Sequence, residues 1–222
     1  MIPDEIQKVC EYLRDRDLPL PEGSRNTRRD SSIAEDRVVD LLRQGEERGE
    51  LNFDIQQAPS EKDWYDVKIG GYYCDIKISN LKSTDNTNAK RAIYYFLTGQ
   101  NPAEEKVPPQ ASAFFPRMLE NESPDEGRDF YYIIIGKTDR DVFPVTLKTA
   151  REFKPSASNL PFQCNWDKNR EPVERSWQEA KDYLLTQWAE SLRRLVTNVL
   201  KGMPKSYPQY FRDLEDILRG SG

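Results

Sequence analysis

Apolar positions recur every three or four residues near both ends of the chain, which is the pattern of amphipathic helices. Between residues 2 and 15, the side chains of Ile6, Val9, Cys10 and Leu13 fall on one side of a helix. The same kind of pattern predicts four further helices: from Ser31 or Ser32 to about Gly49, over NAKRAIYYFLTG ending at Gly99, over 174–200, and over a short stretch after Pro204.

The middle of the chain contains short apolar or alternating segments that predict strands. They are residues 52–57, 64–69, 72–79, 130–136, 142–147 and 161–166. The Gly70-Gly71 pair between the second and third segments indicates a tight hairpin turn. Strands grouped in the middle with helices at both ends predict a single α/β or α+β domain over 1–222. Residues 100–128 are expected to form a surface excursion that includes the apolar stretch ASAFFPRML.

A chain of 222 residues with 36% apolar and 32% charged side chains can form one core beneath a heavily charged surface. No apolar run approaches the roughly 18 residues of a membrane span, and the start MIPDEIQKVCEYL lacks the regions of a signal peptide. We therefore expect a cytoplasmic protein with no membrane partner. Cys10, Cys74 and Cys164 form no CxxC pair, so they predict reduced thiols rather than disulfides or a zinc site.

The chain contains no histidine. This excludes Ser-His-Asp and Cys-His catalysis, the usual zinc hydrolase sites and nucleases that depend on a histidine base. Carboxylates, lysine and a hard metal ion remain as the means of a difficult hydrolysis. The net charge of −5 argues only weakly against a polyanionic partner, because average charge says little about local patches.

The hairpin segment DWYDVKIGGYYCDIKIS (63–79) gathers chemically useful groups. With Gly70 and Gly71 as the two turn residues, the predicted cross-strand pairs are Ile69–Tyr72, Lys68–Tyr73, Val67–Cys74 and Asp66–Asp75. Strand alternation then places Lys77 on the same face as the two carboxylates. Two adjacent carboxylates suit Mg²⁺, and a nearby lysine can orient the attacking water and stabilise charge on phosphorus.

Glu35 is predicted to lie on the apolar stripe of the second helix, beside Val38, Val39 and Leu42. A carboxylate on such a stripe requires a partner, which a metal ion or lysine would provide. The alternative is that Glu35 forms a capping box with Ser32. The acid-x-lysine triplet is a weak signal by itself, since it occurs at several other places in this charged chain, among them Asp66-Val67-Lys68, Glu104-Glu105-Lys106 and Glu179-Ala180-Lys181.

Asp66 followed by Asp75-Ile76-Lys77, with Glu35 upstream, resembles the pattern of the PD-(D/E)xK nuclease superfamily, although Tyr65 rather than proline precedes Asp66. The segments DIKISNLKSTDNTNAKRAIYYFL, FKPSASNLPFQCNWD and SWQEAKDYLLTQWAESLRRLV follow one another as the corresponding parts do in HincII-like type II restriction endonucleases, relatives of EcoRV. The resemblance covers about residues 30–200.

This resemblance implies an α/β fold with a central mixed β-sheet flanked by helices, a catalytic and DNA-recognition core over 30–170, and a helical part over 174–219. It implies a homodimer that cuts both strands of double-stranded DNA at a short palindromic site with Mg²⁺ and leaves blunt ends. A DNA methyltransferase would share the site. Asp66 and Asp75 would be metal ligands, Lys77 the catalytic lysine, and Glu35 a supporting carboxylate.

The loop SNLKSTDNTNAK (79–90) would be the recognition loop, because asparagine can read adenine while Ser, Thr and Lys can contact bases or phosphates. The expected base contacts are Asn86, Thr87 and Asn88; the expected phosphate contacts are Lys82, Ser83 and Lys90; and Asn165 matches a second DNA-contacting segment. Arg25, Arg28 and Arg29 form a basic stretch that either contacts DNA or is a solvated arm.

Two other functions are compatible with these residues. One is a nuclease of the same superfamily that acts on DNA structure or in repair, with the metal site but without a base-reading loop. The other is a DNA-binding module without catalytic activity, in which the acidic hairpin is incidental.

Overall fold

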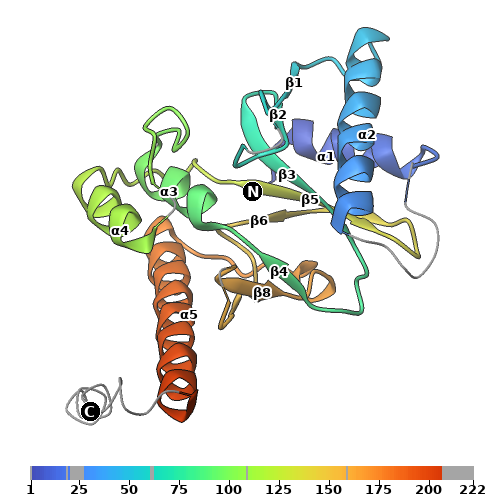
Figure 1. The fold of residues 1–222 in the computed structure, drawn as a ribbon. Coiled ribbons are helices and arrows are strands. Elements are labelled where there is room, and N and C mark those ends of the chain that lie inside the picture. Colours follow the sequence, from blue (N-terminus) through green and yellow to red (C-terminus); the bar gives the residue numbers. More distant parts are fainter. Residues whose placement is uncertain are drawn as a thin grey trace.

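The computed structural model describes residues 2–18, 20, 28–60, 63–108, 110–158 and 160–206. It is an α/β structure with a mixed five-stranded sheet flanked by helices and a smaller three-stranded sheet (Figure 1). The helices are α1 (Asp4–Arg14), α2 (Arg28–Glu47), α3 (Lys90–Thr98), α4 (Ala111–Glu120) and α5 (Trp177–Ser206), with a 3₁₀ helix at Asp167–Asn169. The strands are β1 (Ile55–Gln57), β2 (Val67–Ile69), β3 (Tyr72–Ser79), β4 (Asp85–Thr87), β5 (Tyr131–Gly136), β6 (Val142–Thr146), β7 (Lys154–Pro155) and β8 (Phe162–Cys164).

The large sheet has the strand order β1-β2-β3-β5-β6. β1 pairs with β2 and β2 pairs with β3, both antiparallel. β3 and β5 pair parallel, and β6 pairs antiparallel with β5. A parallel pair requires a crossover connection, and here the crossover from β3 to β5 carries β4, α3 and α4. The small sheet, with the order β4-β8-β7, takes its first strand from this crossover.

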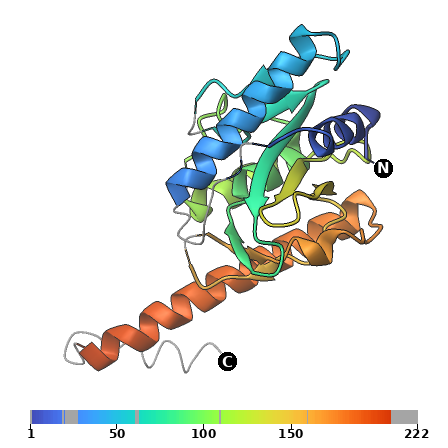
Figure 2. The ribbon, with the colours of Figure 1, turned by 90° about the vertical axis from the view of Figure 1, so that its right-hand side faces the viewer.

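Two apolar layers cover the two faces of the large sheet. On one face, Cys74, Ile76 and Ile78 of β3 pack with α1 and α2. On the other face, Tyr132 and Ile134 of β5 pack with α3, α4, β8 and the first half of α5. Figure 2 shows α5 as the long helix that extends past the rest of the molecule. Within the described residues, no helix is both long and apolar enough to cross a membrane.

The helices α1, α2, α3 and α5 and most strands agree with the sequence-based predictions, whereas α4 was not predicted as a helix. α3 ends as expected at Gly99, which has the left-handed conformation (φ 74°). Two predictions about helix ends are wrong. α2 begins at Arg28, so Ser32 lies inside the helix and the capping box with Glu35 is not formed. α5 continues two residues past Pro204, to Ser206. The predicted final helix lies outside the described residues.

β4 and β7 were not predicted as strands. They are short and contain mainly polar residues or proline, so neither has the alternating apolar pattern of a strand. Both form only because they pair with β8. The surface excursion over 100–128 contains α4, which buries Phe114 and Met118 against the core.

A candidate active site on the edge of strand β3

The β2–β3 hairpin has the predicted register over three pairs: Ile69–Tyr72, Lys68–Tyr73 and Val67–Cys74. Gly70 and Gly71 have positive φ angles of 55° and 99°, which glycine adopts readily in a two-residue hairpin turn. The predicted fourth pair, Asp66 with Asp75, is not part of the ladder. Asp66 precedes β2, and its N–H donates a hydrogen bond to the carbonyl of Cys74 at 2.9 Å.

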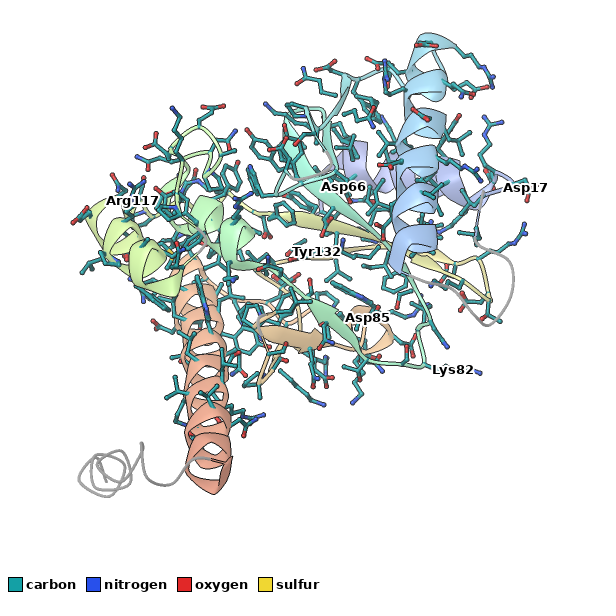
Figure 3. All side chains as sticks on the ribbon, viewed as in Figure 1. Asp17, Asp66, Lys82, Asp85, Arg117 and Tyr132 are labelled. Atoms are coloured by element: carbon teal, nitrogen blue, oxygen red, sulfur yellow. The ribbon has the colours of Figure 1, made fainter. Side chains whose placement is uncertain are left out.

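The two carboxyl groups nevertheless meet. Oδ2 of Asp66 accepts a hydrogen bond from the backbone N–H of Ile76 at 2.6 Å, which turns the side chain toward β3. There its carboxyl group lies within hydrogen-bonding reach of Asp75. Burial and the Asp75 carboxylate raise the pKa of Asp66 to about 9. Figure 3 shows Asp66 beside β3.

Lys77 lies one pleat further along β3, on the same face as Asp75. Its Nζ is 2.8 Å from Oδ2 of Asp75 and also donates to the carbonyl of Ile76 at 3.3 Å. Burial by itself would lower the pKa of Lys77. The carboxylates of Asp75, Asp66 and Glu35 outweigh burial and raise this pKa above its ordinary value. Lys77 is therefore an ammonium group held among three acidic residues.

Glu35 reaches the site from α2. Its Oε1 accepts a long hydrogen bond, 3.5 Å, from the backbone N–H of Ile78. Burial and the Asp75 carboxylate raise the pKa of Glu35, while Lys77 opposes this shift. The predicted inward position of Glu35 near a lysine is thus confirmed, and the backbone N–H of Ile78 is a further partner that was not predicted.

One feature of the sheet explains this grouping. β2 begins at Val67, which pairs with Cys74, so none of the described strands pairs with the β2-side edge of β3 beyond Cys74. The N–H groups of Ile76 and Ile78 face this edge, and the carboxylates of Asp66 and Glu35 accept their hydrogen bonds. The acidic groups therefore provide the pairing that buried backbone donors require.

The donor set can be compared with the needs of a magnesium ion. Mg²⁺ is held in proteins by one or two carboxylates and keeps several waters. Asp66 and Asp75 form such a carboxylate pair, and a cation between them would relieve the repulsion that raises the pKa of Asp66. Among the described residues, no three His, Cys, Asp or Glu side chains are grouped closely enough to hold a metal ion. A Mg²⁺ ion at this position would have only the carboxylates of Asp66 and Asp75 as acidic ligands, and its remaining ligands would be water and substrate oxygens.

A shallow cleft of about 290 Å³ lies beside Asp66. It is lined by Asp36, Gln57, Ala58, Pro59, Ser60, Tyr65 and Asp66. The sequence patterns did not single out Gln57 or Asp36, because the cleft forms only where α2 and the end of β1 come together with the hairpin.

The residues predicted to contact DNA occupy different environments. Lys82, Ser83, Asn86 and Asn88 are exposed, and Figure 3 shows Lys82 at the far end of the β3–β4 connection. Thr87 is only 5% exposed, so its predicted contact with a base does not fit this structure. The reason is that Thr87 lies in β4, where side chains alternate between the two faces.

The remaining predicted contacts are only partly accessible. Lys90 is the first residue of α3 and is partly buried, and this burial lowers its pKa. Asn165 is also partly buried, and its Oδ1 accepts a hydrogen bond from the N–H of Lys168 at 3.3 Å. Arg25 lies outside the described residues, whereas Arg28 and Arg29 are the first residues of α2.

Sequence reasoning missed Asp85, which connects the two sheets. Its Oδ2 accepts hydrogen bonds from the hydroxyl of Ser79 at 2.5 Å and from the indole N–H of Trp166 at 3.0 Å. Ser79 is the last residue of β3 and shares a face with Lys77. The available signal was strand alternation, but it applied only once Asp85 was known to lie in a strand.

No family model matches this chain, and no curated protein is significantly similar to it.

Proposed function

We propose that the protein is a type II restriction endonuclease of the PD-(D/E)xK superfamily, which hydrolyses both strands of double-stranded DNA with Mg²⁺ at a short palindromic site and leaves blunt ends. The observation that carries this proposal is the grouping of Asp66, Asp75, Lys77 and Glu35 along one free strand edge. A structural protein has little reason to gather three half-buried acidic side chains around a single lysine.

Asp66 and Asp75 would hold Mg²⁺, which would supply Lewis-acid activation of the phosphodiester when bound. Lys77 carries a positive charge 2.8 Å from Asp75, where it can orient the attacking water and stabilise negative charge on the phosphoryl oxygens. As water bonds to phosphorus, the bond from phosphorus to the leaving sugar oxygen breaks, and this oxygen takes up a proton as the attacking water gives one up. Glu35 supports the position and charge of Lys77.

The fold is compatible with this activity, because a mixed sheet flanked by helices is what the resemblance to restriction endonucleases implies. The same proposal includes a homodimer, since two copies related by a two-fold axis match the two halves of a palindrome. It also includes a cognate DNA methyltransferase that protects the host site.

The test is digestion of DNA of known sequence with Mg²⁺, followed by sequencing of the fragment ends. Discrete fragments with blunt ends at one palindromic sequence are expected. Smeared products or cutting at branched junctions would instead indicate a structure-specific or repair nuclease. Asp75→Ala should abolish cleavage, and an absence of Mg²⁺-dependent cleavage by the wild type would leave only a DNA-binding role.

A further inference from the structure

The outer face of the small sheet presents a row of polar side chains from three strands. The register pairs Asn86 of β4 with Gln163 of β8, and Gln163 with Lys154 of β7. All three residues are exposed. Residues paired in this way hold their side chains close together on one face of a sheet, so the three form a continuous cross-strand row.

The opposite face of the same strands is buried. Thr87, Phe162 and Cys164 point inward and are at most 5% exposed. Because side chains alternate along a strand, this burial fixes which face Asn86 and Gln163 occupy. The packing of Thr87, Phe162 and Cys164 in the core therefore keeps the side chains of Asn86 and Gln163 on the outer face.

The amide groups in the row are available for binding. Within the part of the chain that the structure describes, the side-chain amides of Asn86 and Gln163 make no hydrogen bond to the protein. Nζ of Lys154 lies 3.1 Å from the carboxylate of Glu152, which is only 16% exposed and also pairs with Lys168, so Lys154 has a partner while most of its own side chain stays exposed. A surface without a binding role can carry such amides, but nothing in it requires two amides to be paired across neighbouring strands.

The small sheet is also fixed relative to the candidate active site. Asp85, directly before Asn86, joins Ser79 at the end of β3 to Trp166 beyond the end of β8. Figure 3 shows Asp85 on β4 below Tyr132 of β5, between the two sheets. A binding face must be held rigidly to the chemistry that it directs, and this carboxylate provides such a connection.

We propose that Asn86 and Gln163 read base edges in the major groove of DNA, with Lys154 as a flanking phosphate contact. Asparagine and glutamine can each bond bidentately to adenine, so A·T base pairs are the expected targets. The major groove admits a two-stranded ribbon, which β4 and β8 form, and the two-residue strand β7 borders it. This inference rests on the proposed function for its DNA partner, and it assigns sequence reading to two strands rather than to one loop.

The test separates binding from cleavage. The full chain carrying Lys77→Ala, which is expected not to cut, is used to select from a random double-stranded DNA library. Asn86→Ala and Gln163→Ala are then added singly to this parent. Asn52→Ala and Gln178→Ala, at exposed positions outside the small sheet, are the matched controls.

We expect the parent to select one sequence, and each row variant to lose roughly 10- to 100-fold of its preference at one base pair per half-site. The controls should keep the parent's preference at every position. Lys154→Ala should weaken binding to all sequences alike and reduce the dependence on salt, as expected for a lost phosphate contact.

Other outcomes would overturn the inference. They are a parent that selects no sequence, row variants that keep the parent's preference, and row variants that weaken all sequences equally. The proposed function is judged separately, by Mg²⁺-dependent cleavage with the wild type. If the parent selects a sequence but the wild type does not cleave DNA, the proposed endonuclease is refuted and the reading face is kept. If the wild type cleaves at one site but Asn86→Ala and Gln163→Ala keep the parent's base preference, the reading face is refuted and the endonuclease is kept.

Discussion

The carboxylate of Asp66 accepts a hydrogen bond from the backbone N–H of Ile76 at 2.6 Å. This contact places a side chain that precedes β2 against the free edge of β3, next to Asp75. Glu35 makes the corresponding contact with the N–H of Ile78, two residues further along. One strand edge is thus completed by acidic side chains instead of a neighbouring strand, and the same side chains surround Lys77.

Lys77→Ala is predicted to lower the rate of DNA cleavage by at least about 100-fold, because the proposed mechanism requires a positive charge beside the reacting phosphate. DNA affinity should change little, since most phosphate contacts of the proposed complex would lie elsewhere. The measurements are a single-turnover cleavage assay and a binding titration. Lys68→Ala is the matched control, because Lys68 lies in the same hairpin over the ring of Tyr73 and should not affect cleavage. Wild-type turnover by Lys77→Ala would refute the assigned role.

Substitutions of Glu35 should separate its structural role from its charge. Glu35→Ala leaves the N–H of Ile78 without its acceptor and should destabilise the fold by about 1 kcal/mol. Glu35→Gln keeps an acceptor oxygen and should restore most of this stability. Because the charge near Lys77 is lost in both, both variants should cleave DNA more slowly. Full activity in Glu35→Gln would show that Glu35 serves only the strand edge.

The raised pKa of Asp66, about 9 in the folded protein, gives a stability dependence on pH. The ordinary pKa of an unfolded aspartate is about 4, so between pH 4 and 9 the folded state holds the proton more strongly. The contribution of Asp66 to stability therefore falls as pH rises through this range. Asp66→Asn should remove this slope and raise Tm at pH 8 by about 2 °C or more.

Thermal melts from pH 5 to 9 would measure this effect, with Asp40→Asn on the exposed side of α2 as a control that keeps the wild-type slope. Addition of Mg²⁺ should raise Tm for the wild type at pH 8 and have little effect on Asp66→Asn. An Asp66→Asn protein with an unchanged pH slope would contradict the prediction.

Asp85→Ala should lower Tm by about 4 °C or more, because the buried hydroxyl of Ser79 and indole of Trp166 both lose their acceptor. Ser79→Ala and Trp166→Phe each remove one of these donors. If both donors act through Asp85, a double variant that combines Asp85→Ala with Ser79→Ala or Trp166→Phe should lose less Tm than the sum of the losses in the two single variants. Strict additivity would show that Asp85 does not join the two sheets energetically.

Much of the hairpin could be predicted because its determinants are local. Two glycines that accept positive φ set the turn, and alternation along β3 then set the faces of Asp75 and Lys77. The prediction failed one residue later, at Asp66. Nothing in the local sequence shows that the chain leaves the ladder there.

The predicted recognition loop illustrates the opposite case. Asn86 and Thr87 are adjacent polar residues that the sequence cannot tell apart, yet one is exposed and the other buried. The difference arises from the pairing of β4 with β8, which are far apart in the chain. Gln163 was missed for the same reason, because its alignment with Asn86 exists only across that pairing.

By itself, the sequence determined the helices α1, α2, α3 and α5, the hairpin turn, the absence of histidine chemistry and the acidic and basic groups available for a reaction. These follow from residue type and short-range periodicity. The tertiary structure alone decided that Asp66 and Glu35 meet the free edge of β3, that Asp85 joins two sheets, and that Asn86, Gln163 and Lys154 form one row. Each of these depends on contacts between residues distant in sequence, and such contacts are set by packing and strand pairing rather than by local preference.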